Sequence, residues 1–151
     1  MPKSKPLVFL DSNVIFSGLY SPDGAPGIIL EHFVNGHIRV VISQQVLQEV
    51  VRTVKEKLPD SLPSLRTLLV NAPPLVVADP TLPDMKHWTK QLQSGDAAVL
   101  AAAIAARPDY FVTGDRHFIE NPDVKETGLT VMTPSQFLKI VEREWGVGAR
   151  G

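Results

Sequence analysis

The sequence contains no cysteine, which excludes disulfide bonds, thiolate metal ligands and cysteine nucleophiles. It also lacks any apolar run near the roughly 18–20 residues that a membrane-spanning helix requires. The first residues carry two lysines but no apolar stretch of signal-peptide length before Asp11. We therefore expect a cytoplasmic protein that does not associate with a membrane.

An excess of basic charge is absent as well, because the net charge of the chain is −1. This argues against a simple nucleic-acid-binding module, which usually carries a basic excess. It does not argue against a nuclease that recruits its substrate through bound divalent cations, because such a site needs acidic residues. The 151 residues fit one domain. We expect its core to span about 7–145, with a flexible tail at 146–151.

Several common catalytic patterns are missing too. The sequence has no phosphate-binding loop, dinucleotide fingerprint, serine-hydrolase elbow or paired-histidine zinc helix. Its four histidines show no spacing typical of metal ligands, and they are His32, His37, His87 and His117. His117 follows Asp115 by two residues and could touch a substrate, but an ordinary surface position is the simpler interpretation.

Short apolar segments alternate with segments of helical periodicity along the chain. The first, Leu-Val-Phe-Leu at 7–10, is continuously apolar and is typical of a strand buried on both faces. The pattern predicts strands at 7–10, 39–42, 75–77, 110–113 and 129–132, and helices at 26–34, 44–57, 62–70, 96–106 and 134–145. This alternation predicts a three-layer α/β/α domain with a mostly parallel central sheet. In such sheets the ligand site lies beyond the carboxyl ends of the strands.

Acidic residues stand at these positions. Asp11 directly follows the first strand, and Asp115 follows the strand at 110–113. Asp96 opens the helix before that strand, and Glu49 lies on the helix after the second strand. Taken singly, Asp96 could be a helix-terminal acid that the helix dipole favours, Asp115 a turn residue or helix cap, and Glu49 a solvated residue. Asp11 is harder to dismiss, because a charge at the end of a buried strand is costly without a partner.

Together these carboxylates predict a specific chemistry. Hard cations such as Mg²⁺ or Mn²⁺ prefer oxygen ligands, which carboxylates supply together with negative charge. Phosphodiester hydrolysis needs an activated water and a stabilised leaving oxygen, and one or two such ions can serve both needs. The sequence offers no competing catalytic set.

Four segments of the chain resemble the motifs of the PIN domain family. They are LVFLDSNVI at 7–15, SQQVLQEV at 43–50, GDAAVLAAA at 95–103 and FVTGDRHF at 111–118. They occur in the family's order, and the resemblance runs from about Leu7 to Leu138. It implies a PIN fold and a Mg²⁺- or Mn²⁺-dependent ribonuclease, with Asp11, Glu49, Asp96 and Asp115 as catalytic and metal-binding residues.

The resemblance also implies supporting residues and partners. Asn13, Ser12 and Thr113 would orient the ligands or the substrate, although Ser12 could equally cap a helix. Many relatives are homodimeric toxins of toxin–antitoxin pairs, inhibited by a partner protein that covers the site. The expected partners are therefore RNA, an antitoxin and a second copy of the chain.

Two details depart from the family's pattern. Gly114 stands where some relatives carry a polar residue such as asparagine, which removes one possible substrate contact. Asp79 and Asp84 lie in a connection where some relatives place acids, so they are alternates to Asp96. We prefer Asp96, because it directly precedes the alanine-rich helix, and we interpret Asp79 and Asp84 as turn residues.

By this hypothesis Asp11, Asp96 and Asp115 bind one cation directly, and Glu49 binds through water or a second ion. Hydrolysis would leave 5′-phosphate and 3′-hydroxyl ends. One alternative is a haloacid-dehalogenase-like phosphatase, but its general acid two residues after the first aspartate is here Asn13. The other is a non-catalytic PIN-like scaffold that binds RNA or protein, which the four clustered acids disfavour.

Overall fold

The centre of the protein is a five-stranded, fully parallel sheet. The computed structural model describes residues 5–90 and 92–145. The sheet has the order β3-β2-β1-β4-β5, and every neighbouring pair is parallel. The strands are β1 (Leu7–Leu10), β2 (Arg39–Ser43), β3 (Leu75–Val77), β4 (Tyr110–Val112) and β5 (Val131–Met132). The expected α/β class with a parallel sheet is confirmed.

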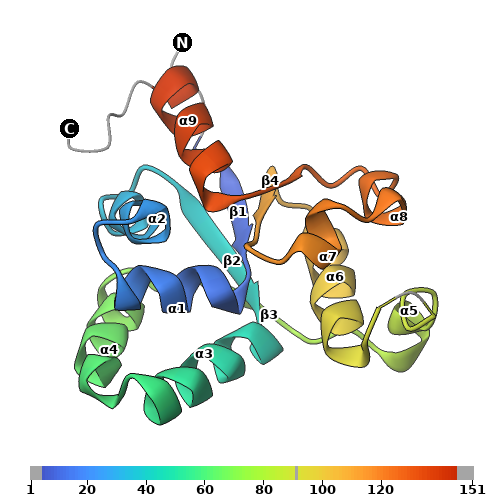
Figure 1. Ribbon diagram of the computed structural model, residues 1–151, viewed down its shortest axis with the longest axis horizontal. Helices are drawn as coiled ribbons and strands as arrows, with labels where there is room; N and C mark the ends of the chain where they lie inside the picture. The colour runs from blue at the N-terminus through green and yellow to red at the C-terminus, as the bar shows by residue number, and fades with distance from the viewer. Residues whose placement is uncertain (1–4, 91, 146–151) are drawn as a thin grey trace.

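Helices cover both faces of this sheet. On one side lie α1 (Ser12–Tyr20), α2 (Ala25–Val34), α3 (Gln44–Lys57) and α4 (Leu62–Asn71), with the 3₁₀ turn η1 (Pro59–Ser61) between the last two (Figure 1). On the other side lie α5 (Leu82–Lys86), α6 (Ser94–Ala106), α7 (Arg116–Ile119) and α8 (Pro122–Lys125) (Figure 1). The last helix, α9 (Pro134–Trp145), packs against α2. None of the helices in the described part of the chain combines the length and apolar character needed to cross a membrane.

The strand order reverses direction between β1 and β4. From β1 the chain builds β2 and then β3 toward one edge, and it then returns to add β4 and β5 on the other side of β1. Parallel crossovers are right-handed, so this reversal sends the two groups of helices to opposite faces. The loops after β1 and β4 therefore diverge, and they leave a crevice at the carboxyl ends of these two strands, where open α/β sheets bind ligands.

Aromatic rings and small side chains fill the core between these layers. The rings of Phe9 on β1 and Phe111 on β4 meet edge to face with centroids 5.4 Å apart, and Phe118 packs against Phe111 at 5.3 Å. Every residue of α6 from 97 to 103 is buried. Five of these seven residues are alanine, and their small side chains let the helix approach the sheet closely.

Most predicted elements are confirmed, including the Ser43 cap of α3, whose hydroxyl accepts a hydrogen bond from Val46 N. The helices α1, α5, α7 and α8 were not among the predicted elements, and α6 begins at Ser94, so Asp96 lies within its first turn and does not open it. Helix α1 begins directly after Asp11, whose side chain caps it. The last strand is two residues shorter than expected, because Leu129 N donates to Thr127 Oγ1 in a turn and not to the sheet. The tail expected at 146–151 lies outside the described residues.

The turn between α1 and α2 depends on Gly27. A Cβ atom at this position would overlap the backbone carbonyl of Pro22, and backbone cannot move aside as a flexible side chain can. At Gly24, in the same turn, an added Cβ would meet Ser21 O at 3.5 Å, an ordinary contact. Glycine at 27 therefore allows the start of α2 to approach the backbone of Pro22 without strain.

We predict that Gly27→Ala lowers the free energy of unfolding by about 1–3 kcal/mol or more, as overpacking does. Gly24→Ala is the matched control, and it should cost less than about 1 kcal/mol because Gly24 precedes the helix in an extended conformation open to alanine. Urea denaturation followed by circular dichroism measures both changes. Equal losses in the two variants would contradict the contact described at Gly27.

Candidate functional site

Asp11 lies at the carboxyl end of β1 and is 6% exposed. Its Oδ1 accepts a hydrogen bond from Ser12 N at 2.8 Å, which caps α1. Its Oδ2 accepts two more, from Thr113 Oγ1 at 2.8 Å and from Asn13 Nδ2 at 3.2 Å. A carboxylate has about four acceptor positions, so these three bonds fix the side chain and leave room for a further ligand.

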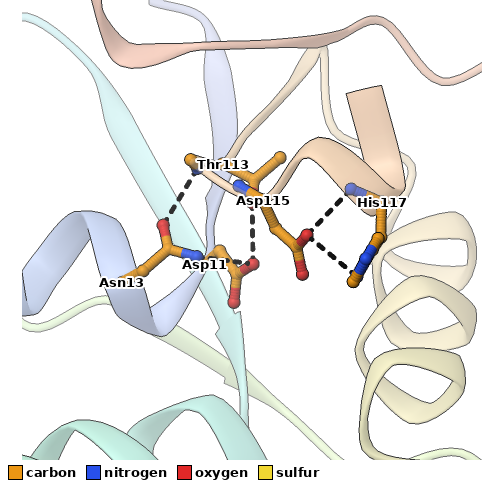
Figure 2. A network of polar contacts seen from close by, with 6 residues as sticks. Asp11, Asn13, Thr113, Asp115 and His117 are labelled. Carbon is orange, nitrogen blue, oxygen red and sulfur yellow. Dashed lines mark hydrogen bonds and ion pairs between the residues drawn. The ribbon is translucent and has the colours of Figure 1, made fainter. Parts of the chain in front are cut away.

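Thr113 and Asn13 join the ends of β1 and β4 (Figure 2). Besides donating to Asp11, the fully buried Thr113 hydroxyl accepts a hydrogen bond from Asp115 N at 3.0 Å. Asn13 Oδ1 accepts a hydrogen bond from Gly114 N at 3.0 Å, while its Nδ2 donates to Asp11. The two side chains thereby hold Asp11 and the backbone of Asp115 in one hydrogen-bonded unit.

Asp115 caps the short helix α7 and reaches His117. Its Oδ1 accepts a hydrogen bond from His117 N at 2.8 Å, and it lies 3.4 Å from Nδ1 of the imidazole (Figure 2). Among the described residues this is the only ion pair found for the four predicted acids. The cap explains the local structure, but the second oxygen, Oδ2, takes no part in either contact.

Glu49 is half-buried on α3 and turns toward this edge of the sheet. Its Oε2 accepts a hydrogen bond from Ser12 Oγ at 2.9 Å, and its Oε1 accepts one from Gln45 Nε2 at 3.1 Å. Gln45 Nε2 also donates to Gly95 O at 3.2 Å, next to Asp96 on α6. Glu49 is thus held in place from α1 and α3, and it is not a freely solvated residue of its helix.

The negative charges of these acids are close enough to raise the pKa values of two of them. Burial raises the pKa of Asp11 from 3.8 to about 6, against the hydrogen bonds from Thr113 and Ser12, and the charges of Glu49 and Asp115 raise it further. Burial likewise raises the pKa of Asp96, followed by the charge of Asp115 and that of Glu49, while His117 lowers it. Within residues 5–90 and 92–145 no lysine or arginine forms a salt bridge with any of the four. The site therefore concentrates negative charge that a cation would stabilise.

A group of possible metal ligands among the described residues includes His117, which the sequence predicted to be an ordinary surface residue. Asp96, Asp115 and His117 each offer a ligand atom, and these atoms lie within 4.8 Å of one another. Asp11 and Glu49 are coupled to the group electrostatically but do not belong to it. One feature of the sequence could have predicted this position of His117. The residue lies two positions after an aspartate that caps a helix, and such a cap brings the backbone of the second following residue to the carboxylate.

The alternate acids have other partners. Asp84 forms a capping box with Thr81 at the start of α5. Asp79 Oδ1 accepts a hydrogen bond from Gln45 N at 2.9 Å at the start of α3. Both line a separate hollow with Pro80 and Trp88. The structure does not bring either one into the group of Asp96 and Asp115.

Beside the carboxylates the surface is open. A hollow of about 500 Å³ is lined by Gln93, Asp96, Arg116, His117 and Asn121, among others. It combines the carboxylates of Asp96 and Glu120 with an exposed guanidinium and an exposed imidazole.

Solved structures share this fold. A chain in the crystal structure of VapBC2 from Rickettsia felis, bound to a DNA fragment from their promoter, superposes with a TM-score of 0.60 at 16% identity, covering 84% of this chain and 98% of that one. The crystal structure of PAE2754 from Pyrobaculum aerophilum superposes with a TM-score of 0.61 at 15% identity, covering 91% of this chain and 90% of that one. A search of curated proteins finds no match.

The sequence itself matches a family. The PIN domain model covers residues 7–117, which is most of the chain and includes the residues after β1 and β4 that form the hydrogen-bonded unit. The expected resemblance is confirmed, as is the expected fold. This chain belongs to the PIN domain family.

Proposed function

We propose that this protein is a ribonuclease that depends on Mg²⁺ or Mn²⁺ and hydrolyses RNA phosphodiester bonds at Asp11, Glu49, Asp96 and Asp115. One observation carries the proposal. The carboxylates that follow β1 and β4 stand at the point where the strand order reverses, joined through Thr113 and coupled to Asp96 and Glu49. Membership of the PIN domain family supports a nuclease activity in general.

The residues fit a hard divalent cation. All four carboxylates supply oxygen, the ligand atom that Mg²⁺ and Mn²⁺ prefer. Burial, and after it the charges of Glu49 and Asp115, raise the pKa of Asp11, and no lysine or arginine among the described residues forms a salt bridge with it. When bound, such an ion supplies a water nucleophile at neutral pH and stabilises the charge that develops on the phosphate oxygens.

Each protein group then has a distinct task. Asp115 and Asp96 would hold the cation directly, and Asp11 would contribute the acceptor position that its three hydrogen bonds leave free. Glu49 acts through water or with a second ion when substrate phosphate arrives. Thr113, Asn13 and Ser12 fix the orientation of the carboxylates, as residues behind metal ligands commonly do. In-line attack of water on phosphorus would leave 5′-phosphate and 3′-hydroxyl ends.

The proposal extends to partners. The Rickettsia felis neighbour is described as part of a VapBC2 assembly. This supports the proposal that a partner protein also controls the present chain, as an antitoxin would, by covering the carboxylates. A homodimer remains a prediction of the family resemblance, and a cytoplasmic location stays an expectation.

Removing one carboxylate charge tests the function. We predict that Asp11→Asn and Asp115→Asn each reduce cleavage of a mixed RNA pool with Mn²⁺ by at least about a hundredfold, since even residues behind metal ligands contribute ten- to a hundredfold. Asparagine caps helices as well as aspartate does, so the starts of α1 and α7 should persist. In Asp11→Asn the amide nitrogen replaces one oxygen, so the hydrogen bonds from Thr113 and Asn13 are weakened together with the charge. The exposed Asp60→Asn is the matched control. No cleavage by the natural sequence would favour the non-catalytic scaffold.

The pKa of Asp11 predicts how stability depends on pH. Because its folded pKa of about 6 lies above the ordinary 3.8, the folded protein binds this proton more tightly than the unfolded chain. In EDTA this group should therefore raise the free energy of unfolding by up to about 3 kcal/mol as the pH falls from 7 toward 4. This stabilisation is lost as the pH rises through 6. Urea denaturation across this range should show that the free energy of unfolding depends less on pH in Asp11→Asn than in the natural sequence. If the free energy of unfolding changed equally with pH in both proteins, the raised pKa of Asp11 would be contradicted.

Thr113 offers a separate test of the hydrogen-bonded unit. Thr113→Val keeps the shape of the side chain but leaves Asp115 N without its acceptor and Asp11 without one donor. We therefore predict that the free energy of unfolding falls by about 1–3 kcal/mol and that RNA cleavage becomes much slower. Thr113→Ser keeps the hydroxyl and removes one methyl group, so the free energy of unfolding should fall by about 1 kcal/mol and most of the activity should remain. Urea denaturation and RNA cleavage rates measure the two effects in each variant. Equal activity of the two variants would contradict a role for the hydroxyl.

A further inference from the structure

His117 differs from an ordinary surface histidine in how it is held. Its side chain is 77% exposed, yet its backbone N is tied to Asp115 Oδ1 at 2.8 Å in the first turn of α7. Its Nδ1 lies 3.4 Å from that same oxygen, and no other side-chain partner is found for it among residues 5–90 and 92–145. The imidazole therefore stands beside the carboxylates with a ring nitrogen open to a ligand.

The spacing of the neighbouring ligand atoms suits a shared ion. The ligand atoms of Asp96, Asp115 and His117 lie within 4.8 Å of one another. Two ligands on opposite sides of a cation such as Mg²⁺ are separated by about 4.2 Å, twice a bond of about 2.1 Å. Only a small adjustment is needed, and an exposed side chain such as that of His117 can make it.

We propose that His117 supplies a nitrogen ligand to the divalent-cation site, and that this makes the site prefer Mn²⁺ over Mg²⁺. The inference rests on the proposed function, because it assigns a further ligand to the same cation. His117 also lines the hollow that contains Asp96, so the imidazole and the carboxylate face one open space. A ligand set of carboxylates with one imidazole is not the all-oxygen set expected from the sequence.

The preference follows from ligand chemistry. Mg²⁺ favours carboxylate, carbonyl and water oxygen, and it gains little from an imidazole. First-row transition ions accept imidazole more readily than Mg²⁺ does, and at a given nitrogen- and oxygen-containing site Mn²⁺ is the weakest binder of that series. Mn²⁺ is thus a stringent probe, because carboxylates suit both Mn²⁺ and Mg²⁺, and a loss of Mn²⁺ affinity when the imidazole is removed reports the nitrogen ligand. It is also paramagnetic, so its ligands can be observed directly.

Calorimetric titration of the tag-free, full-length protein with Mn²⁺ and with Mg²⁺ tests the affinity. We expect His117→Ala to weaken Mn²⁺ binding about ten- to a hundredfold, as loss of a group that supports a metal site does. Mg²⁺ binding should change by less than about twofold, since the carboxylates remain. The matched control is His87→Ala, because His87 is exposed at the end of α5 and does not belong to the group around Asp96.

Electron spin echo spectroscopy of the Mn²⁺-loaded protein identifies the ligand itself. We expect nitrogen modulation typical of a coordinated imidazole in the natural sequence and in His87→Ala, and none in His117→Ala. Circular dichroism of the metal-free variants should match the natural protein, because both histidine side chains are exposed.

The outcomes separate this inference from the proposed function. If Mn²⁺ binds with unchanged affinity in His117→Ala and the natural protein shows no nitrogen modulation, His117 is not a ligand, while the carboxylate site and the nuclease proposal stand. If the natural protein binds neither cation, the inference and the proposed cation dependence both fail.

Discussion

The parallel pairing of β1 with β4 is the constraint on which the site depends. The register places Leu10 opposite Val112, and Asp11 N continues the ladder by donating to Val112 O at 3.1 Å. The next residues, Asp11 and Thr113, therefore come side by side, and the threonine hydroxyl can bond the carboxylate. A shift of one residue would turn each side chain to the other face of the sheet and separate them. The apolar strands thus fix the position of a polar site that contributes little to the core.

That site opposes the stability of the metal-free protein. A carboxylate that is 6% exposed, with a pKa raised to about 6 and further acids nearby, is charged at neutral pH at a cost in free energy. The hydrogen bonds to Asp11 from Ser12, Asn13 and Thr113 offset part of this cost. Such an arrangement is typical of a functional site, where clustered charge persists because a ligand that binds only the folded state stabilises it.

Two of the acids serve the fold and the proposed chemistry at once. Asp11 caps α1 and Asp115 caps α7, so each has an ordinary structural role that would by itself explain its presence. The cap at Asp115 also brings His117 to the carboxylates. A helix start placed directly after a buried strand therefore does two things: it satisfies the first N–H groups of the helix, and it holds an acid at the edge of the sheet where ligands bind.

The sequence by itself determined the parallel α/β domain and the order of its main elements, because buried strands and helix caps are set by local patterns of apolar residues and turn residues. It also singled out Asp11 and Asp115, since both follow apolar strands, and the resemblance to the PIN domain family added Glu49 and Asp96. Only the tertiary structure decided how these groups contact one another and that His117 lies beside them. Glu49 lies off the apolar stripe of its helix, and its contact with Ser12 arises from the way α1 packs against α3. The proximity of Asp96 and His117 likewise depends on the placement of α6 beside α7, a long-range contact that local patterns do not encode.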